Sequence, residues 1–371
     1  MSESILDKVM DSQKNQERAN FDPSEMLTLL FKVLTSKEED VLRRRHGLSG
    51  TRKQTLEAIG TLYDVTRERI RQIESAAIRK IKSHPQFHPT VKPARHTIVL
   101  VLREEGAGIM EQELLLRKLL NFTPRTDENI KSLLFLLEHL IDEVELVNAS
   151  EHLKRGWKLT TTSLELVHEL LECLKEIVAT AERPVSMQEL WDQFTKHEVG
   201  SHHASRMDSD ILASHVTLSR KLGRNPFGEF GLSEWGEIIP KRMNDKIYLI
   251  LKRAGKPMHF HEIADQINKA KFDQRNAYPP TVHNELILND RYVLVGRGVY
   301  ALSEWGYRPG VVADVIADLL RDHPEGVTRE QITEHVLKQR FVKKNTIYLA
   351  LTNHDQFEKR GKVFVLRSEK S

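Results

Sequence analysis

The chain has 371 residues, of which 39% are hydrophobic and 29% charged, with a formal net charge of +3; this length allows two to four domains, and such charge is typical of helical modules with much exposed surface. A single cysteine, Cys173, excludes a disulfide framework and any cysteine-based zinc site, and we expect it to be a small core residue. No apolar run approaches the ~18 residues that span a membrane, and the N-terminus lacks a secretion-signal pattern, so we expect a cytoplasmic protein.

Residues 1–21 predict a polar N-terminal tail, and residues 22–86 predict the first folded module. Within it, the stretch 55–81 reads as two short helices around a tight turn. Thr66 can cap the second helix, because its hydroxyl accepts from an otherwise unpaired backbone N–H. Apolar side chains then recur at helical spacing and predict a buried stripe: Ile70, Ile73, Ala77 and Ile81. The first helix adds three residues to the same core: Leu56, Ile59 and Leu62. Together they predict a helix-turn-helix.

The second helix carries polar side chains on the face opposite this stripe, and these suit the edges of DNA bases. They are Arg67, Glu68, Arg71 and Gln72. Arginine can donate two hydrogen bonds to guanine, glutamine can pair with adenine, and a carboxylate can accept from cytosine. Residues 37–90 hold 12 Lys and Arg against 7 Asp and Glu, a net charge of about +5. The surrounding cations would hold phosphates: Arg43, Arg44, Arg45, Arg52, Lys53, Arg79, Lys80 and Lys82. The alternative is a solvated basic helix that contacts nothing.

Three segments of this module resemble region 4 of the bacterial sigma-70 family, whose helix-turn-helix reads the −35 promoter element. They are VLRRRHGL (41–48), TLEAIG (55–60) and VTRERIRQIESAAIRKI (65–81). The resemblance extends over residues 22–86, under a fifth of the chain. It places base reading on the same four polar residues of the second helix. It also implies phosphate contacts at Arg43, Arg45, Thr55 and Leu56, the last through its backbone N–H. In that family, region 4 also binds a flexible flap on the polymerase beta subunit.

The chain departs from a complete sigma factor in what precedes this module. A sigma factor needs an earlier region with a long, aromatic-rich helix that melts the −10 element and grips the polymerase core. Here about twenty polar residues without an aromatic precede the match. We therefore expect a regulator that uses the −35 reader, rather than a protein that opens promoters by itself.

Residues 83–95 carry three prolines and predict a linker. Beyond it, residues 94–160 predict helices at 95–105, 110–120 and 127–141, followed by the short strands VELVN and GWKLT. The third of these helices is acidic and apolar, so we expect this module to pack or bind protein rather than DNA. Residues 94–160 and 161–236 each predict a winged-helix-like module, the second with a long first helix, a capping box at Ser186–Glu189 and a helix near 208–222.

The motif LSEWG occurs at Leu232–Gly236 and again at Leu302–Gly306, 70 residues later, which predicts tandem small domains rather than a solenoid. In residues 240–305 we expect a helix ending at Gly255, two further helices, and two strands joined at Gly296–Gly298. This is the pattern of a winged helix. GKPMHFHEIADQI and RYVLVGRGVYAL resemble the HARE-type winged-helix family, which includes the N-terminal domain of the delta subunit of some bacterial RNA polymerases.

Residues 308–367 predict a final winged helix on the same plan, with a capping box at Thr328–Gln331 opening its second helix. Five cations lie where winged helices usually meet DNA, at the start of the third helix and at the wing tip: Lys343, Lys344, Lys359, Arg360 and Lys362. They are a possible second DNA contact. The alternative is that they are solvated turn residues.

The 17 histidines do not show the spacing of a metal site, since none of the close pairs has a suitable third ligand. The sequence also lacks the HExxH, GxSxG, GxGxxG and phosphate-loop motifs. We therefore expect no metal, no cofactor and no enzymatic activity. The predicted fold class is mostly α, with an N-terminal helix-turn-helix bundle followed by tandem winged-helix modules.

These observations favour a sequence-specific DNA-binding transcription regulator that reads a −35-like element and acts with bacterial RNA polymerase. The alternative is an interaction adaptor that docks on polymerase or other proteins through its winged-helix modules. A third hypothesis, an accessory factor of a nucleic-acid enzyme, has less support, because the sequence shows no nuclease motif. The predicted partners are double-stranded DNA and RNA polymerase, and the oligomeric state stays open.

Overall fold

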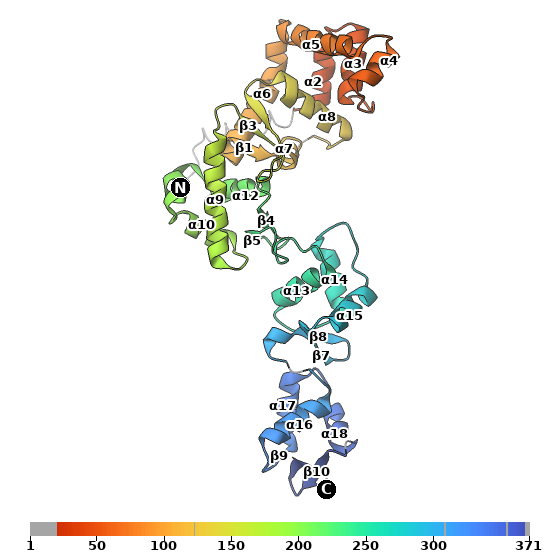
Figure 1. Ribbon diagram of the computed structural model, residues 1–371, viewed down its shortest axis with the longest axis vertical. Coiled ribbons are helices and arrows are strands. Elements are labelled where there is room, and N and C mark those ends of the chain that lie inside the picture. Colours follow the sequence, from red (N-terminus) through yellow and green to blue (C-terminus); the bar gives the residue numbers. More distant parts are fainter. Residues whose placement is uncertain (1–20, 122, 308, 354, 368–371) are drawn as a thin grey trace, which may run out of the picture. The chain divides into compact units, whose positions relative to one another are not determined.

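A computed structural model describes residues 21–121, 123–307, 309–353 and 355–367 (Figure 1). These residues are mostly helical with small antiparallel sheets, so the predicted fold class is confirmed at that level. The chain forms two compact units: one contains residues up to Arg224 together with Phe230–Leu232, and the other contains the remainder. Among the described helices, none combines the length and the apolar character needed to cross a membrane.

From Phe21 onward, the described part of the first unit begins with four helices, and a side chain from the preceding residue caps each of them. Asp22, Thr35, Thr55 and Thr66 accept backbone N–H groups of the first turns, and Thr35 forms a full capping box with Glu38. Such caps stop the helices from extending backwards and so fix the turns between them. The helices are α2 (Pro23–Phe31), α3 (Ser36–His46), α4 (Leu56–Leu62) and α5 (Arg67–Ser83), and the last two form the predicted helix-turn-helix.

Residues 83–95 do not form the predicted linker, because α6 (Phe87–Gly106) begins inside them. Pro89 lies in the first turn, where a missing N–H costs no hydrogen bond. Pro93 lies inside the helix. Phe87, Val91 and Ala94 are buried at helical spacing, so packing of this face offsets the backbone cost of Pro93. Proline content alone therefore gave the wrong prediction here.

The elements from α6 to β3 pack on the same hydrophobic core as α2. This single core contains residues from Phe21 to Leu159. Phe31 of α2 meets Phe135 edge to face, with ring centroids 5.8 Å apart. Strands β1, β2 and β3 form an antiparallel sheet in the order β1-β3-β2. The helices and strands predicted at 110–160 are present. The helix predicted at 110–120 begins only at Gln112, because its first two residues belong to a strand. They are β1 (Ile109–Glu111), α7 (Gln112–Leu119), α8 (Asp127–Phe135), a π-helical turn (Leu136–Leu140), β2 (Val144–Val147) and β3 (Gly156–Leu159).

The last part of the first unit is a helical layer. The long helix predicted there is α9, and Cys173 of α9 is buried as expected. Helix α12 contacts both β1 and α6, which joins this layer to the preceding sheet. The elements are α9 (Leu164–Ala181), α10 (Met187–Phe194), α11 (Glu198–His203), a 3-10 turn (Ala204–Arg206), α12 (Ser209–Leu218), β4 (Leu222–Arg224) and β5 (Phe230–Leu232).

The second unit repeats one order of elements twice: helix, short strand, two helices and a two-stranded hairpin. In each repeat the short strand pairs with the second strand of the hairpin, giving sheet orders β6-β8-β7 and β10-β11-β9. The first repeat consists of α13 (Met243–Ala254), β6 (Met258–His259), α14 (Phe260–Ala270), α15 (Pro279–Leu288), β7 (Tyr292–Gly296), β8 (Val299–Leu302) and a 3-10 turn (Ser303–Trp305). The second consists of α16 (Val312–Asp322), β9 (Val327–Thr328), α17 (Arg329–Gln339), α18 (Lys344–Asn353), β10 (Phe357–Arg360) and β11 (Val363–Leu366).

Candidate nucleic-acid interface

The turn between α4 and α5 is held by a close approach of the turn residue Val65 to Gly60 of α4. The backbone N–H of Val65 donates to the carbonyl of Gly60 at 3.0 Å. A Cβ placed on Gly60 would lie only 2.6 Å from the carbonyl oxygen of Val65. The hydroxyl of Thr66 then caps α5 by accepting from the backbone N–H of Arg69 at 3.2 Å. Glycine at this position therefore sets how tightly the second helix can lie against the first.

Helix α5 is anchored by its apolar stripe, as the sequence predicted, although Ile73 of that stripe is only partly buried. Ile70 is fully buried in a small core with Val41 of α3 and Ile59 of α4, and Ala77 and Ile81 are buried on the same side. Leu62 was expected in this core, but 56% of its surface is exposed. It is the last residue of α4, and its side chain lies outside the contact with α5. The anchoring leaves the opposite face of α5 directed away from the protein interior.

The four predicted base-reading residues all lie in the first half of α5 and are exposed. Arg71 donates to both carboxylate oxygens of Glu68, at 2.7 and 2.9 Å. These hydrogen bonds lower the pKa of Glu68 and raise that of Arg71. The pair lies in water on the helix surface, where such contacts are weak and exchangeable. Arg71 can therefore leave Glu68 for a base edge at little cost, and until then the pair holds both side chains over the exposed face.

Gln72 has a partner of the same kind, because its side-chain oxygen accepts from Arg69 at 3.3 Å. Arg67 is the first residue of α5 and lies at its positively polarised end. The exposed face thus combines donors and acceptors within two turns of one helix. This is the length of helix that a major groove accommodates.

Three of the predicted phosphate contacts are cations, and each of these already has a partner within the protein. Arg43 pairs with Glu39 at 2.7 Å and Lys80 with Glu38 at 2.9 Å. Arg45 donates to the backbone carbonyl of Gln54 at 3.3 Å. To bind phosphate, these cations would exchange carboxylate or carbonyl oxygens for phosphate oxygens.

Two of the predicted phosphate contacts are built into the start of α4. The hydroxyl of Thr55 caps this helix by accepting from Ala58 N–H at 3.1 Å. Leu56 packs its half-buried side chain on the helix-turn-helix core and is the first helical residue. The N–H groups of a first turn have no intrahelical acceptor and point outward. The backbone there is consistent with the phosphate contact expected through Leu56.

The five C-terminal cations of the sequence prediction are exposed on the last repeat of the second unit. Lys343 and Lys344 lie at the start of α18, and the others lie in and beside the turn between β10 and β11. Gly361 forms the tip of this turn with φ of 66°. Arg360 pairs with Glu358 of its own strand at 3.0 Å. We refer below to this set as the C-terminal cations.

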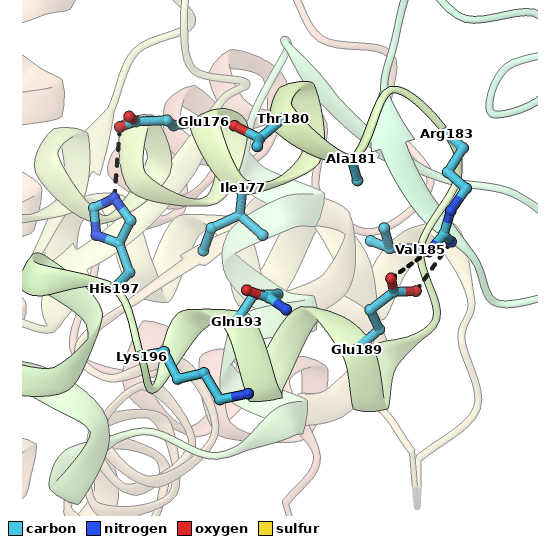
Figure 2. Close-up of a pocket in the computed structure, with 10 residues that line it drawn as sticks. All are labelled: Glu176, Ile177, Thr180, Ala181, Arg183, Val185, Glu189, Gln193, Lys196 and His197. Atoms are coloured by element: carbon cyan, nitrogen blue, oxygen red, sulfur yellow. Dashed lines mark hydrogen bonds and ion pairs between the residues drawn. The ribbon is translucent and has the colours of Figure 1, made fainter.

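A cavity of about 390 Å³ lies between α9 and α10 (Figure 2). Four of its polar side chains form two pairs, Arg183 with Glu189 at 2.5 Å and His197 with Glu176 at 3.5 Å. Ile177 lines the cavity between these two pairs (Figure 2). These pairs tie the segments that flank α10 to the two helices, and we assign this cavity no ligand.

One cluster of polar side chains was not foreseen from the sequence. His46 of α3 lies against Glu138 and His139 of the π-helical turn, two segments far apart in the chain. Burial lowers the pKa of His139 to about 4, so its imidazole is neutral at pH 7. No spacing pattern signals this cluster, because it depends on how α3 packs against the turn after α8.

Comparison with known proteins finds one matching family model, that of sigma-70 region 4, over residues 30–83. The chain is 51% identical over 63 residues to the RNA polymerase sigma factor SigA1 of Synechococcus elongatus, a match that covers 17% of this chain and 16% of that protein. It is 48% identical over 68 residues to SigA of a Nostoc species, covering 18% and 17% of the two chains. SigA of a Synechocystis species matches at the same identity and length, with 16% of its chain covered. The match therefore spans about a sixth of each relative's length.

The resemblance of the N-terminal module to region 4 is thus supported by both the family model and the relatives, and it includes all of α4 and α5. The resemblance of residues 240–305 to HARE-type winged helices stays a prediction, as do the roles of the individual site residues.

Proposed function

We propose that this protein is a sequence-specific DNA-binding transcription regulator that reads a −35-like promoter element through α5 and acts with bacterial RNA polymerase in the cytoplasm. One observation carries the proposal: Arg67, Glu68, Arg71 and Gln72 are exposed on one face of α5, while its isoleucine stripe is buried on the other. This arrangement lies in the segment that matches sigma-70 region 4.

In the proposed complex, the first half of α5 lies in the major groove. Arg71 exchanges the Glu68 carboxylate for the O6 and N7 edge of a guanine, and Glu68 becomes free to accept from a cytosine amine. Gln72 releases Arg69 and pairs with an adenine. Arg43, Arg45 and Lys80, with the backbone at the start of α4, hold the flanking phosphates and fix the register of the helix.

The second unit would add to this binding without reading sequence. Its two repeats have the element order of winged helices, and we propose that they are such modules, the first of HARE type. The C-terminal cations would then contact phosphates beyond the site read by α5. We propose that the first module also docks on the beta flap of polymerase.

A second candidate is an interaction adaptor, in which the second unit binds protein. It is favoured by large apolar side chains on α15 and just before it: 82% of Leu288, 61% of Ile287 and 66% of Tyr278 are exposed. Exposed apolar residues that lie close in sequence on one element often mark protein contacts. In this case the chain would show no salt-dependent affinity for DNA.

Selection of bound fragments from a random DNA pool, followed by binding at several salt concentrations, separates the two candidates. The full chain should be used, because the core of the first module continues into residues up to Leu159. We expect one enriched sequence motif. With the three cations of the first module and the five C-terminal cations on phosphates, we also expect log Kd to rise against log salt with a slope of up to about 7, of which roughly 3 comes from the first module. Absence of an enriched motif, with no measurable binding at low salt, would leave the adaptor.

A further inference from the structure

The packing of α3 against the π-helical turn brings three potential metal ligands together. One nitrogen of His46, one nitrogen of His139 and one carboxylate oxygen of Glu138 all lie within 4.8 Å of one another. The two imidazole rings meet edge to face, with centroids 4.8 Å apart. Phe135 packs against both rings, at centroid distances of 4.9 and 5.0 Å, and so fixes their positions. The cluster therefore lies on a rigid part of the core rather than on a loop.

His139 has an unused ligand atom. Its Nε2 is buried and has no hydrogen-bond partner among the described residues, and the nearest carboxylate oxygen, on Glu138, lies at 3.8 Å. Buried polar atoms nearly always have a partner, so an exception calls for an explanation. A neutral imidazole nitrogen binds a metal ion readily, so a metal ion could be this partner.

His46 has the support that metal-binding histidines usually have. Its Nε2 and a carboxylate oxygen of Glu74 on α5 are 2.9 Å apart. A carboxylate that hydrogen-bonds to a ligating imidazole fixes the orientation of the ring and makes it a better ligand.

We propose that His46, His139 and Glu138 bind one divalent transition-metal ion, with Zn²⁺ as the best fit, and that Glu74 orients His46 for this role. Two imidazoles and a carboxylate are a ligand set typical of zinc, with a fourth position left for water. Bonds of about 2.0–2.1 Å in a tetrahedral site place donors roughly 3.3 Å apart. The three donors would approach one another by about 1.5 Å or less from their present limit. Rotation of the Glu138 side chain, which is 28% exposed and would release its ion pair with Arg155 at 3.1 Å, and small ring movements can supply this approach.

The ion would join two parts of the first unit. His46 is the last residue of α3 in the helix-turn-helix bundle, whereas the other two ligands lie in the π-helical turn after α8. An ion that binds only the folded arrangement stabilises it by mass action. The site would therefore tighten the joint between the predicted DNA-reading bundle and the module after it. This inference does not depend on whether α5 reads DNA.

The test is Zn²⁺ binding to the metal-free full chain, by calorimetry with ZnCl₂ and by thermal melting with and without the ion. The variants are Glu138→Gln and His139→Gln. Glu138→Gln replaces the most exposed of the three ligands by a side chain of the same size, so it leaves the hydrophobic core intact. Because the chain has 17 histidines, the matched control is the double variant His202→Gln and His203→Gln, which removes an adjacent pair at the end of α11.

We expect one Zn²⁺ per chain in the unmodified protein and in the control, with a rise in melting temperature. Affinity should fall at least about 10- to 100-fold in both ligand variants, as it does when metal sites lose a supporting group, and the rise in melting temperature should vanish. Equal binding by the unmodified protein and Glu138→Gln, or a loss of binding only in the His202 and His203 control, would overturn the proposal.

Discussion

Replacement of Gly60 by alanine tests whether the helix-turn-helix has the tight packing described above. The added Cβ would lie 2.6 Å from the carbonyl oxygen of Val65, where ordinary contact begins at 3.4 Å. The obstacle is backbone and cannot rotate away, so α4 has to move from the Val65 carbonyl in the turn before α5 by up to about 0.8 Å. Overpacking of this kind costs roughly 2–3 kcal/mol. Alanine in place of glycine inside a helix returns about 1 kcal/mol. The net expectation is a destabilisation of about 1–2 kcal/mol.

Hydrogen–deuterium exchange of the full chain, followed on peptides from α4 and α5, measures this change locally. A destabilisation of 1–2 kcal/mol corresponds to roughly 5- to 30-fold faster exchange through opening. The matched control is Thr61→Ala on the next residue, which is exposed and whose hydroxyl bonds only to the carbonyl of Glu57; its exchange should change little. The direction of the change in exchange rate is decisive. Without a clash, the higher helix propensity of alanine would slow exchange in Gly60→Ala. Slower exchange would refute the close approach of Val65 to Gly60.

Three further predictions follow from burial and charge. Ile70→Ala should lower the free energy of unfolding of this module by about 2–5 kcal/mol in urea melts, because Ile70 is fully buried, whereas Leu62→Ala should stay within about 0.5 kcal/mol. Burial raises the pKa of the Cys173 thiol to about 11, so a disulfide reagent at pH 8 should modify it slowly in the folded protein and fast in urea; fast reaction of the folded chain would contradict its placement. Replacement of all five C-terminal cations by glutamine should reduce the salt slope of DNA binding by up to about 4.5, and an unchanged slope would show that they are solvated turn residues.

The parts of this structure that the sequence predicted well are those where one local pattern decides the outcome. In α5, the spacing of Ile70, Ala77 and Ile81 predicted the buried face, and Thr66 predicted the first residue of the helix. Hydrophobic periodicity and caps act over a few residues, so they can be recognised without knowing the neighbours. The helices and hairpins of the second unit were predictable for the same reason.

Predictions failed where contacts distant in sequence override local signals. The prolines of 83–95 predicted a linker, but packing of Phe87 and Val91 on the core of the first unit holds that segment in α6. Leu62 was assigned to the core because of its spacing, although α4 ends there and the side chain has no partner surface to cover it. The cluster of His46, Glu138 and His139 could not be predicted either, since nothing in the sequence indicates that α3 meets the turn after α8.

Base selectivity of an Arg71→Ala variant is the most direct test of the central claim, that α5 reads DNA. Binding of the full chain would be measured on its selected site and on the same site with single-base changes. The control is Lys175→Ala on α9. Like Arg71, Lys175 is an exposed cation that pairs with a glutamate three residues earlier, Glu172, at 2.7 Å. We expect discrimination at one guanine to fall roughly 5- to 150-fold in Arg71→Ala and to stay unchanged in the control. Full discrimination by Arg71→Ala at every position would contradict the account.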